Sequence, residues 1–106
     1  MNEPTGVLLK DLRDGVGRIY GSRLKGVYLF GSYARGDQAE GSDLDILIVL
    51  DAVGPYGEEL ERTGELVSGL SLRAGVSISR VLVSEKDWTG GDTPFLRHAK
   101  AEAISA

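Results

Sequence analysis

The chain has 106 residues, of which 42% are hydrophobic, carries a formal net charge of -4 at pH 7 and contains no cysteine. Its length predicts one domain over residues 1–106, and its acidic balance argues against a broad nucleic-acid-binding surface, which needs a basic face or stripe. The lack of cysteine excludes disulfides and thiolate metal sites, and the lack of a signal peptide or a long apolar run predicts a cytoplasmic protein with no membrane partner.

The first elements in the chain are predicted to be a helix and a short strand. Apolar residues recur at helical spacing over residues 5–20, with Thr5 as the expected N-cap. Glycines from Gly15 onward should weaken this helix near its end. Residues 27–30 form a short apolar run that stops at Gly31, and a run of this length is typical of a buried strand.

Three further elements are expected in the middle of the chain. Residues 32–35 fit a helical turn with Ser32 at its N-cap, and a glycine-containing loop follows. Residues 44–50 are rich in Ile, Leu and Val, which predicts a second buried strand. Residues 58–74 show the spacing of a surface helix, and its acidic residues are expected to face solvent. These acidic residues are Glu58, Glu59, Glu61 and Glu65.

The last third of the chain predicts a strand and a helix. Residues 76–83 read as a third strand, whose change of apolar phase indicates a bulge or burial on both faces. Trp88 is expected to anchor the following segment to the core. Thr93 and Pro94 are typical of a helix start, so a last helix is expected over residues 94–104. This order predicts an α/β fold of the α+β type, a small mixed β-sheet of three to four strands flanked by helices.

The strongest indication of function is a pair of carboxylates at the start of the second strand. Asp43 and Asp45 are separated by one residue, and alternate residues of a strand point to the same face. Two nearby carboxylates repel each other, so this arrangement favours a bound cation. Oxygen ligands indicate Mg²⁺ or Mn²⁺. Asp43 and Asp45 are therefore the predicted catalytic and metal-binding residues.

The segment before this pair has the features of a phosphate-binding loop. Gly31 would let a phosphate approach the backbone closely, and the Ser32 hydroxyl can join backbone N–H groups in binding it. Arg35 would bind phosphate through charge-assisted hydrogen bonds, or else pair with Asp37 or Glu40 at the surface. A triphosphate held here would place its α-phosphate beside the metal site, which predicts nucleotidyl transfer from a nucleoside triphosphate.

These motifs together carry a family resemblance. They are Gly31-Ser32, Tyr33-Ala34-Arg35-Gly36 and, after a spacing of ten residues from Ser32, Asp43-x-Asp45. The pattern resembles the minimal nucleotidyltransferases of the DNA polymerase β superfamily. The resemblance implies a nucleotidyltransferase-like fold, contacts from Gly31 and Ser32 to the nucleotide phosphates, and two Mg²⁺ ions held by Asp43 and Asp45.

One feature of that superfamily is missing from the sequence. Its active members resemble one another in a third carboxylate on the next strand, and residues 76–83 contain no Asp or Glu. Glu85 and Asp87 follow this strand, so either could serve as the third carboxylate only if the register of the strand were shifted. Otherwise a partner protein or the substrate supplies the missing metal ligand. The expected position is occupied by Ser77, Ser79 or Arg80.

Two functions follow from the resemblance. The first is an enzyme that transfers a nucleoside monophosphate, with AMP the expected group, to an acceptor hydroxyl, and that acts as antitoxin to a small helical partner of the HEPN type. The alternative is a catalytically weak or inactive nucleotide-binding module that neutralises its partner by binding. Apolar residues of the last helix would face the core or a second subunit in a homo-oligomer. They are Phe95, Leu96, Ala99 and Ala103.

Overall fold

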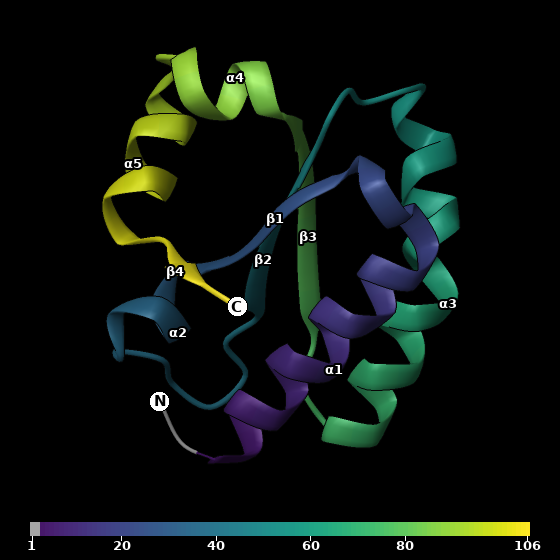
Figure 1. Cartoon of the computed structure of the whole chain (residues 1–106). Helices are drawn as coiled ribbons and strands as arrows, with labels where there is room; N and C mark the ends of the chain where they lie inside the picture. The colour runs from purple at the N-terminus through teal and green to yellow at the C-terminus, as the bar shows by residue number, and fades with distance from the viewer. Residues whose placement is uncertain (1–2) are drawn as a thin grey trace.

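Four strands form one mixed sheet in the order β3-β2-β1-β4 (Figure 1). In the computed structural model, which describes residues 3–106, β1 (Leu24–Phe30) pairs antiparallel with both β2 (Leu44–Leu50) and β4 (Ile104–Ser105). The edge strand β3 (Ile78–Ser84) runs parallel to β2. Parallel neighbours need a crossover connection, and α3 (Tyr56–Ala74) provides it. The predicted α+β fold with a small mixed sheet is confirmed.

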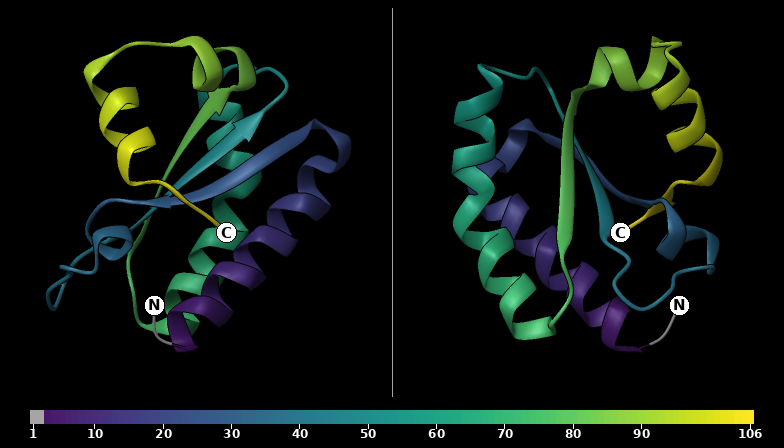
Figure 2. Two further views of the ribbon diagram at one scale, coloured as in Figure 1. Left: turned by 60° about the vertical axis from the view of Figure 1, so that its left-hand side comes forward. Right: turned by 180° about the vertical axis from the view of Figure 1, so that it is seen from behind.

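Helices cover both faces of the sheet (Figures 1 and 2). On one face α1 (Glu3–Tyr20) and α3 lie side by side, and on the other lie the short α4 (Glu85–Gly90) and α5 (Pro94–Glu102). The 3₁₀ turn η1 (Gly21–Arg23) joins α1 to β1, and the single turn α2 (Ser32–Arg35) follows β1. Within residues 3–106, every helix is too short or too polar to cross a lipid bilayer.

Strand β2 contributes to the packing on both faces, which accounts for its almost uninterrupted apolar sequence. Its even-numbered residues join the larger core cluster with α1 and α3, namely Leu44, Ile46, Ile48 and Leu50. Leu47 and Val49 point the other way and pack with Ala99 of α5. Asp45 has the same parity as Leu47, so the α5 face of the sheet is the one that carries the acidic residue.

Helix α1 begins earlier than the sequence predicted and continues through its glycines. Thr5 lies inside the helix, so its assignment as N-cap is wrong, because Pro4 is tolerated in a first helical turn and does not delay the start. Gly15 marks a close contact between two helices. A Cβ atom there would lie 2.7 Å from Cδ2 of Leu66 in α3, so the missing side chain allows α1 and α3 to approach.

The C-terminal segment also differs from the prediction. Thr93 does cap α5, since its side chain accepts the N–H of Leu96, but the helix ends at Glu102 and not at residue 104. Ile104 instead pairs with Leu29, because the free edge of β1 offers backbone groups that a short strand can bind. Two elements were missed here, α4 and β4.

Two further expectations concerned a bulge in the third strand and the packing of Trp88. The β2–β3 register runs without a shift, so the change of apolar phase reflects burial on both faces and not a bulge. Ile78 and Leu82 belong to the α1–α3 cluster, whereas Val83 packs in the cluster on the α5 face. The ring of Trp88 lies 5.0 Å from that of Tyr28, which confirms that Trp88 anchors α4 to the sheet.

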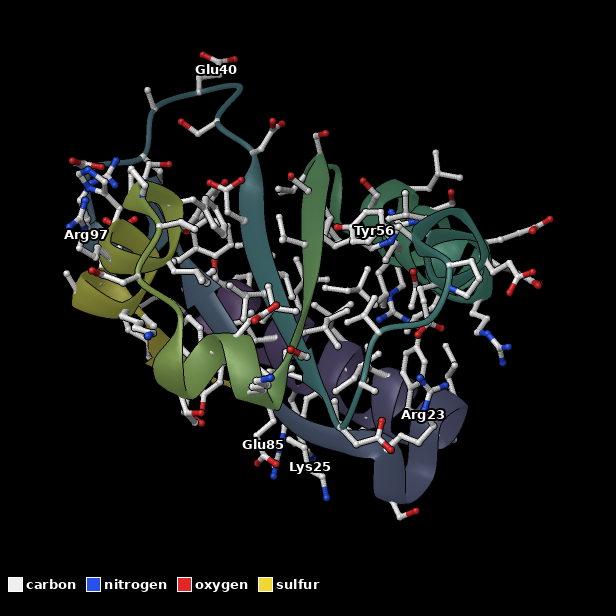
Figure 3. The ribbon with its side chains drawn as sticks, turned by 90° about the horizontal axis from the view of Figure 1, so that it is seen from above. Arg23, Lys25, Glu40, Tyr56, Glu85 and Arg97 are labelled. Atoms are coloured by element: carbon white, nitrogen blue, oxygen red, sulfur yellow. The ribbon has the colours of Figure 1, made fainter. Side chains whose placement is uncertain are left out.

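Glu59 contradicts the expectation of a solvent-exposed acidic face on α3. It is 2% exposed, and its carboxylate binds the guanidinium of Arg23 at 3.0 Å and the N–H of Gly54 at 3.2 Å. The hydroxyl of Tyr20 also donates to it. Burial alone would raise the pKa of Glu59, but the bonds from Gly54 and Arg23 more than offset this and lower it. Figure 3 shows Arg23 at the end of the sheet where α1 passes into β1.

Candidate functional site

Asp45 lies at the centre of the candidate site, at the beginning of β2. In the sheet its neighbours are Phe30 of β1 and Ser79 of β3. The carboxylate is partly buried on the face that α5 covers only in part, and Asp43 precedes it in the loop that enters the strand. The structure thus brings together the two predicted metal-binding residues near one end of the sheet.

The electrostatics of Asp45 are those of a crowded carboxylate. Burial raises the pKa of Asp45 above its usual value, and the negative charges of Asp43 and Glu102 raise it further. The positive charge of Arg35 opposes these effects. A carboxylate whose surroundings disfavour its negative charge is typical of a site that binds a cation.

Gly31 passes directly against this carboxylate. Its backbone has φ 76° and ψ -157°, a conformation almost restricted to glycine. A Cβ atom on Gly31 would overlap Oδ2 of Asp45 and lie 3.0 Å from its Cγ. Glycine is therefore required here for two independent reasons, backbone conformation and contact with Asp45.

The turn after Gly31 differs in one respect from the prediction. Ser32 is the first residue of α2 and not its N-cap, because Gly31 takes that place and its carbonyl accepts the N–H groups of Ala34 and Arg35. Ser32 is partly buried beside Gly31. Gly31 and Ser32 are thus consecutive along the backbone, Arg35 follows within the same turn, and Gly31 lies against Asp45.

Arg35 is held by two acidic residues. Its Nε donates to Oδ2 of Asp37 at 3.1 Å, and its Nη1 donates to Oε2 of Glu102 at 2.7 Å. The other oxygen of Glu102, Oε1, accepts the backbone N–H of Gly31 at 3.0 Å. Both contacts lower the pKa of Glu102, the bond from Arg35 more than that from Gly31. One carboxylate from α5 therefore binds two of the three residues predicted to hold phosphate.

Sequence reasoning missed Glu102, which is 67 residues away from Arg35 along the chain. One signal was available. An acidic residue in the last turn of a helix is electrostatically unfavourable, because the C-terminal end of a helix carries partial negative charge. Glu102 ends α5, so a cationic partner outside the helix could have been expected.

Of the three residues expected near the position of the superfamily's third carboxylate, Ser79 is the one beside Asp45. It pairs in register with Asp45 and is exposed. Arg80 points to the other side, where its Nε donates to Oγ1 of Thr63 at 2.7 Å and its Nη2 donates to the carbonyl of Leu60. Arg80 is therefore part of the α3 layer and does not contribute to the candidate site.

The suggestion that Glu85 or Asp87 could replace this carboxylate is wrong. The register between β2 and β3 has no shift as far as Ser84, which pairs with Leu50. Leu50 is the last residue of β2, and Asp45 lies near the other end of that strand. Glu85 and Asp87 then follow in α4. In Figure 3, Glu85 lies at the same end of the sheet as Lys25, and Glu40, in the loop before β2, lies at the other end.

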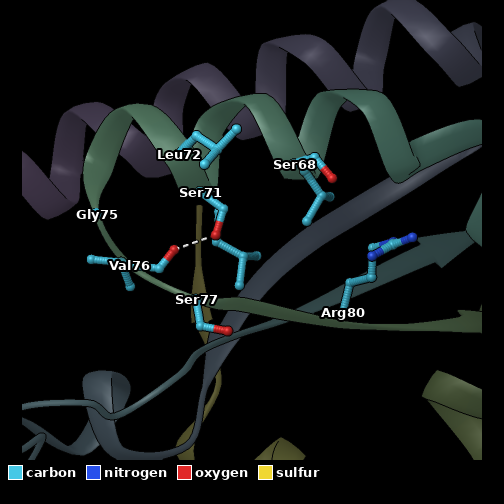
Figure 4. Close-up of a pocket in the computed structure, with 9 residues that line it drawn as sticks. Ser68, Ser71, Leu72, Gly75, Val76, Ser77 and Arg80 are labelled. Carbon is cyan, nitrogen blue, oxygen red and sulfur yellow. Dashed lines mark hydrogen bonds between the residues drawn. The ribbon is translucent and has the colours of Figure 1, made fainter.

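A groove of about 590 Å³ lies between α3 and the edge strand β3 (Figure 4). Ser77 and Arg80 line its β3 side, and Ser68 and Ser71 line its α3 side. The Ser71 hydroxyl is already bound to the carbonyl of Val76. The groove contains none of the residues predicted to bind phosphate or metal, so it is separate from the candidate site.

The carboxylates at the site fit a hard divalent cation. Within residues 3–106, no group of three or more His, Cys, Asp or Glu side chains is arranged to hold a metal. Mg²⁺ commonly takes only one or two carboxylates and completes its shell with water and substrate phosphates. Asp43 and Asp45 supply two carboxylates beside the predicted phosphate-binding residues, so the donor set suits Mg²⁺ or Mn²⁺ bound together with a nucleotide.

Comparisons with a family model and with a curated protein both indicate nucleotidyl transfer. A family model described as a nucleotidyltransferase domain matches residues 9–93. A Methanocaldococcus jannaschii protein, provisionally named protein adenylyltransferase MJ0604, is 38% identical over 86 residues, which cover 81% of this chain and 78% of that protein.

Solved structures support the same fold. A toxin–antitoxin complex with AMP-PNP matches with a TM-score of 0.64 and 21% identity, over 98% of this chain and 72% of the matched one. The complex of tri-AMPylated Shewanella oneidensis HEPN toxin with MNT antitoxin matches with a TM-score of 0.57 and 19% identity, over 96% of this chain and 67% of the matched one. At these identities the two structures support the fold alone.

Proposed function

Because the chain belongs to the nucleotidyltransferase domain family and is a nucleotidyltransferase, we propose that it transfers AMP from ATP to a protein hydroxyl group. The acceptor oxygen forms a bond to the α-phosphorus, the bond between that phosphorus and the bridging oxygen of the β-phosphate breaks, and pyrophosphate leaves. The hydroxyl proton passes to solvent or to a base on the acceptor. The name of the M. jannaschii relative, protein adenylyltransferase, supports AMP as the group and protein as the acceptor.

Each residue of the candidate site has one role in this proposal. The Gly31 N–H, the Ser32 hydroxyl and the Arg35 guanidinium bind the outer phosphates. Asp43 and Asp45 hold Mg²⁺ or Mn²⁺ next to the α-phosphate. A bound divalent ion would offset the negative charge that builds up on the phosphates during in-line attack. The observation that carries the proposal is the crowded Asp45 carboxylate, in contact with the glycine of the phosphate-binding segment.

We further propose that a small helical protein of the HEPN type is the acceptor and partner, with this chain as its antitoxin. The described HEPN–MNT complex supports this, since its toxin is AMPylated and a chain of the complex shares the fold of this chain. The exposed Ser79 beside Asp45 is consistent with an acceptor that provides its own proton-accepting group. The need for cellular ATP agrees with the expected cytoplasmic location.

The test is incubation with α-labelled ATP and Mg²⁺, with and without a small helical protein of the HEPN type. Label on the partner that disappears in Asp43→Asn and in Asp45→Asn supports the proposal. Asp37→Asn is the matched control, because it removes an acidic residue outside the metal pair. Nucleotide binding without label on any protein would contradict AMP transfer and favour the binding module.

A further inference from the structure

The Glu102 carboxylate lies where the proposed function places phosphate oxygens. Its two oxygens accept from the Gly31 N–H at 3.0 Å and from Nη1 of Arg35 at 2.7 Å. A carboxylate and a phosphate present the same kind of hydrogen-bond acceptor to such donors. Glu102 therefore satisfies, within the chain, the groups assigned to the outer phosphates of the nucleotide.

Glu102 and a triphosphate cannot share these donors. The Gly31 backbone has a single N–H, and a hydrogen bond to Glu102 uses it. Arg35 can rotate one face of its guanidinium toward another acceptor, but a triphosphate beside Glu102 would add negative charge next to an unneutralised carboxylate. The negative charge of Glu102 already acts on the nearby Asp45, so a triphosphate would add to the repulsion among these negative groups.

The second partner of Arg35 behaves differently. Asp37 accepts from Nε of Arg35 at 3.1 Å, whereas the Gly31 N–H is bound by Glu102. Its side chain is 62% exposed, whereas that of Glu102 is 20% exposed. Asp37 can thus remain in place while phosphate binds the other edge of the guanidinium, and Glu102 cannot.

From these contacts we propose that Glu102 occupies the phosphate-binding groups of the nucleotide-free protein, and that nucleotide binds only after displacing it. Glu102 is then a residue that sets the affinity for nucleoside triphosphate by competition. This inference rests on the proposed function, because it takes Gly31 and Arg35 as the phosphate-binding groups. A purely structural role for Glu102 predicts that loss of its carboxylate weakens nucleotide binding or leaves it unchanged. Competition predicts that this loss strengthens nucleotide binding.

Competition predicts that removal of the carboxylate tightens nucleotide binding. If the form with Glu102 bound outnumbers the open form about tenfold, the apparent Kd is about tenfold weaker than the intrinsic one. Glu102→Gln keeps the size of the side chain and loses the charge. We expect its Kd for AMP-PNP with Mg²⁺, measured by calorimetry, to be at least about fivefold lower than that of the wild-type chain. Asp37→Asn should change the Kd by less than about twofold, as an exposed pair contributes little.

A second measurement uses the unaltered protein. The carboxyl ¹³C resonance of Glu102 reports whether the group is bound, and titration with AMP-PNP should move it to the position of a free carboxylate. A Glu102→Gln Kd equal to or higher than that of the wild type, or a Glu102 resonance unmoved at saturation, overturns the inference and leaves the proposed function intact. If AMP-PNP binds neither protein, the nucleotide site itself is wrong and both proposals fall.

Discussion

A side chain on Gly31 and the carboxylate of Asp45 would occupy the same space, since a Cβ atom at position 31 overlaps Oδ2 of Asp45. Gly31 directly follows β1, whose last residue Phe30 pairs with Asp45 at the start of β2. The absence of a side chain at Gly31 therefore leaves room for the Asp45 carboxylate, in addition to the role of Gly31 in the phosphate-binding segment. The two motifs of the sequence are one structural unit, because a side chain at position 31 would displace the Asp45 carboxylate.

This contact predicts a double effect of Gly31→Ala. The positive φ should cost about 1–3 kcal/mol of unfolding free energy, and displacement of the Asp45 carboxylate should abolish AMP-PNP binding. Urea denaturation and calorimetry measure the two effects. Gly41→Ala is the matched control, because Gly41 has φ 85° with no atom within 4 Å of an added Cβ. Equal nucleotide binding by both variants would contradict the importance of the contact.

Asp45 itself should lower the stability of the metal-free protein near neutral pH. Its pKa is higher in the folded than in the unfolded chain, so the folded state binds more protons and the free energy of unfolding falls as pH rises between the two pKa values. We expect Asp45→Asn, without divalent metal, to be more stable than the wild type above this interval. AMP transfer should fall by about 10²-fold or more.

Urea denaturation from about pH 4 to about pH 8, with a chelator present, measures the stability effect. The exposed Asp37→Asn provides the comparison, since it removes a negative charge outside the metal pair. An Asp45→Asn variant that is less stable than the wild type at the upper end of this range would show that the carboxylate contributes to the fold, and not only to the site.

The missing third carboxylate suggests a gain-of-function variant. Ser79→Asp would place an acidic group in register with Asp45 on an exposed position of β3. An added charged ligand should tighten binding of Mg²⁺ or Mn²⁺ by about tenfold, which paramagnetic resonance of Mn²⁺ can measure. Ser68→Asp, on the exposed surface of α3, controls for net charge. Equal metal affinity in the two variants would refute the assignment of the metal to this edge of the site.

The sequence predicted what depends on neighbouring residues. The range of β2 agrees with the expectation, because a continuous apolar run between polar loops has few other solutions in a buried strand. Gly31 and Asp45 were identified because each lies in a short motif. The start of α1 was misjudged by two residues, as helix ends generally are when several residues can serve as caps.

What the sequence did not reveal depends on distant pairing. β4 exists only because Ile104 meets the free edge of β1 at Leu29. Glu102 reaches Gly31 across 71 residues, and Glu59 reaches Arg23 across 36. No local pattern distinguishes Glu59 from its solvent-exposed neighbours on α3, and only its place in the last turn of a helix distinguishes Glu102. Both proved to be bound to arginine, which is the usual requirement for a buried or half-buried carboxylate.

Glu59 provides the clearest pH-dependent prediction for the fold. Its pKa is lower in the folded than in the unfolded chain, so its contribution is complete above the unfolded value of about 4.3 and is lost as pH falls through the folded value. Glu59→Gln should cost about 1–3 kcal/mol at neutral pH, because Arg23 and the Gly54 N–H lose a charged partner. The variant should then lose less stability in acid than the wild type.

Urea denaturation at several pH values from neutral to acid tests this prediction. Glu61→Gln is the matched control, since Glu61 lies on the same helix and is exposed. The difference in unfolding free energy between wild type and Glu59→Gln should shrink as the pH is lowered, while that between wild type and Glu61→Gln stays small throughout. A difference for Glu59→Gln that does not depend on pH would mean that packing, and not the charge, accounts for the burial of this residue.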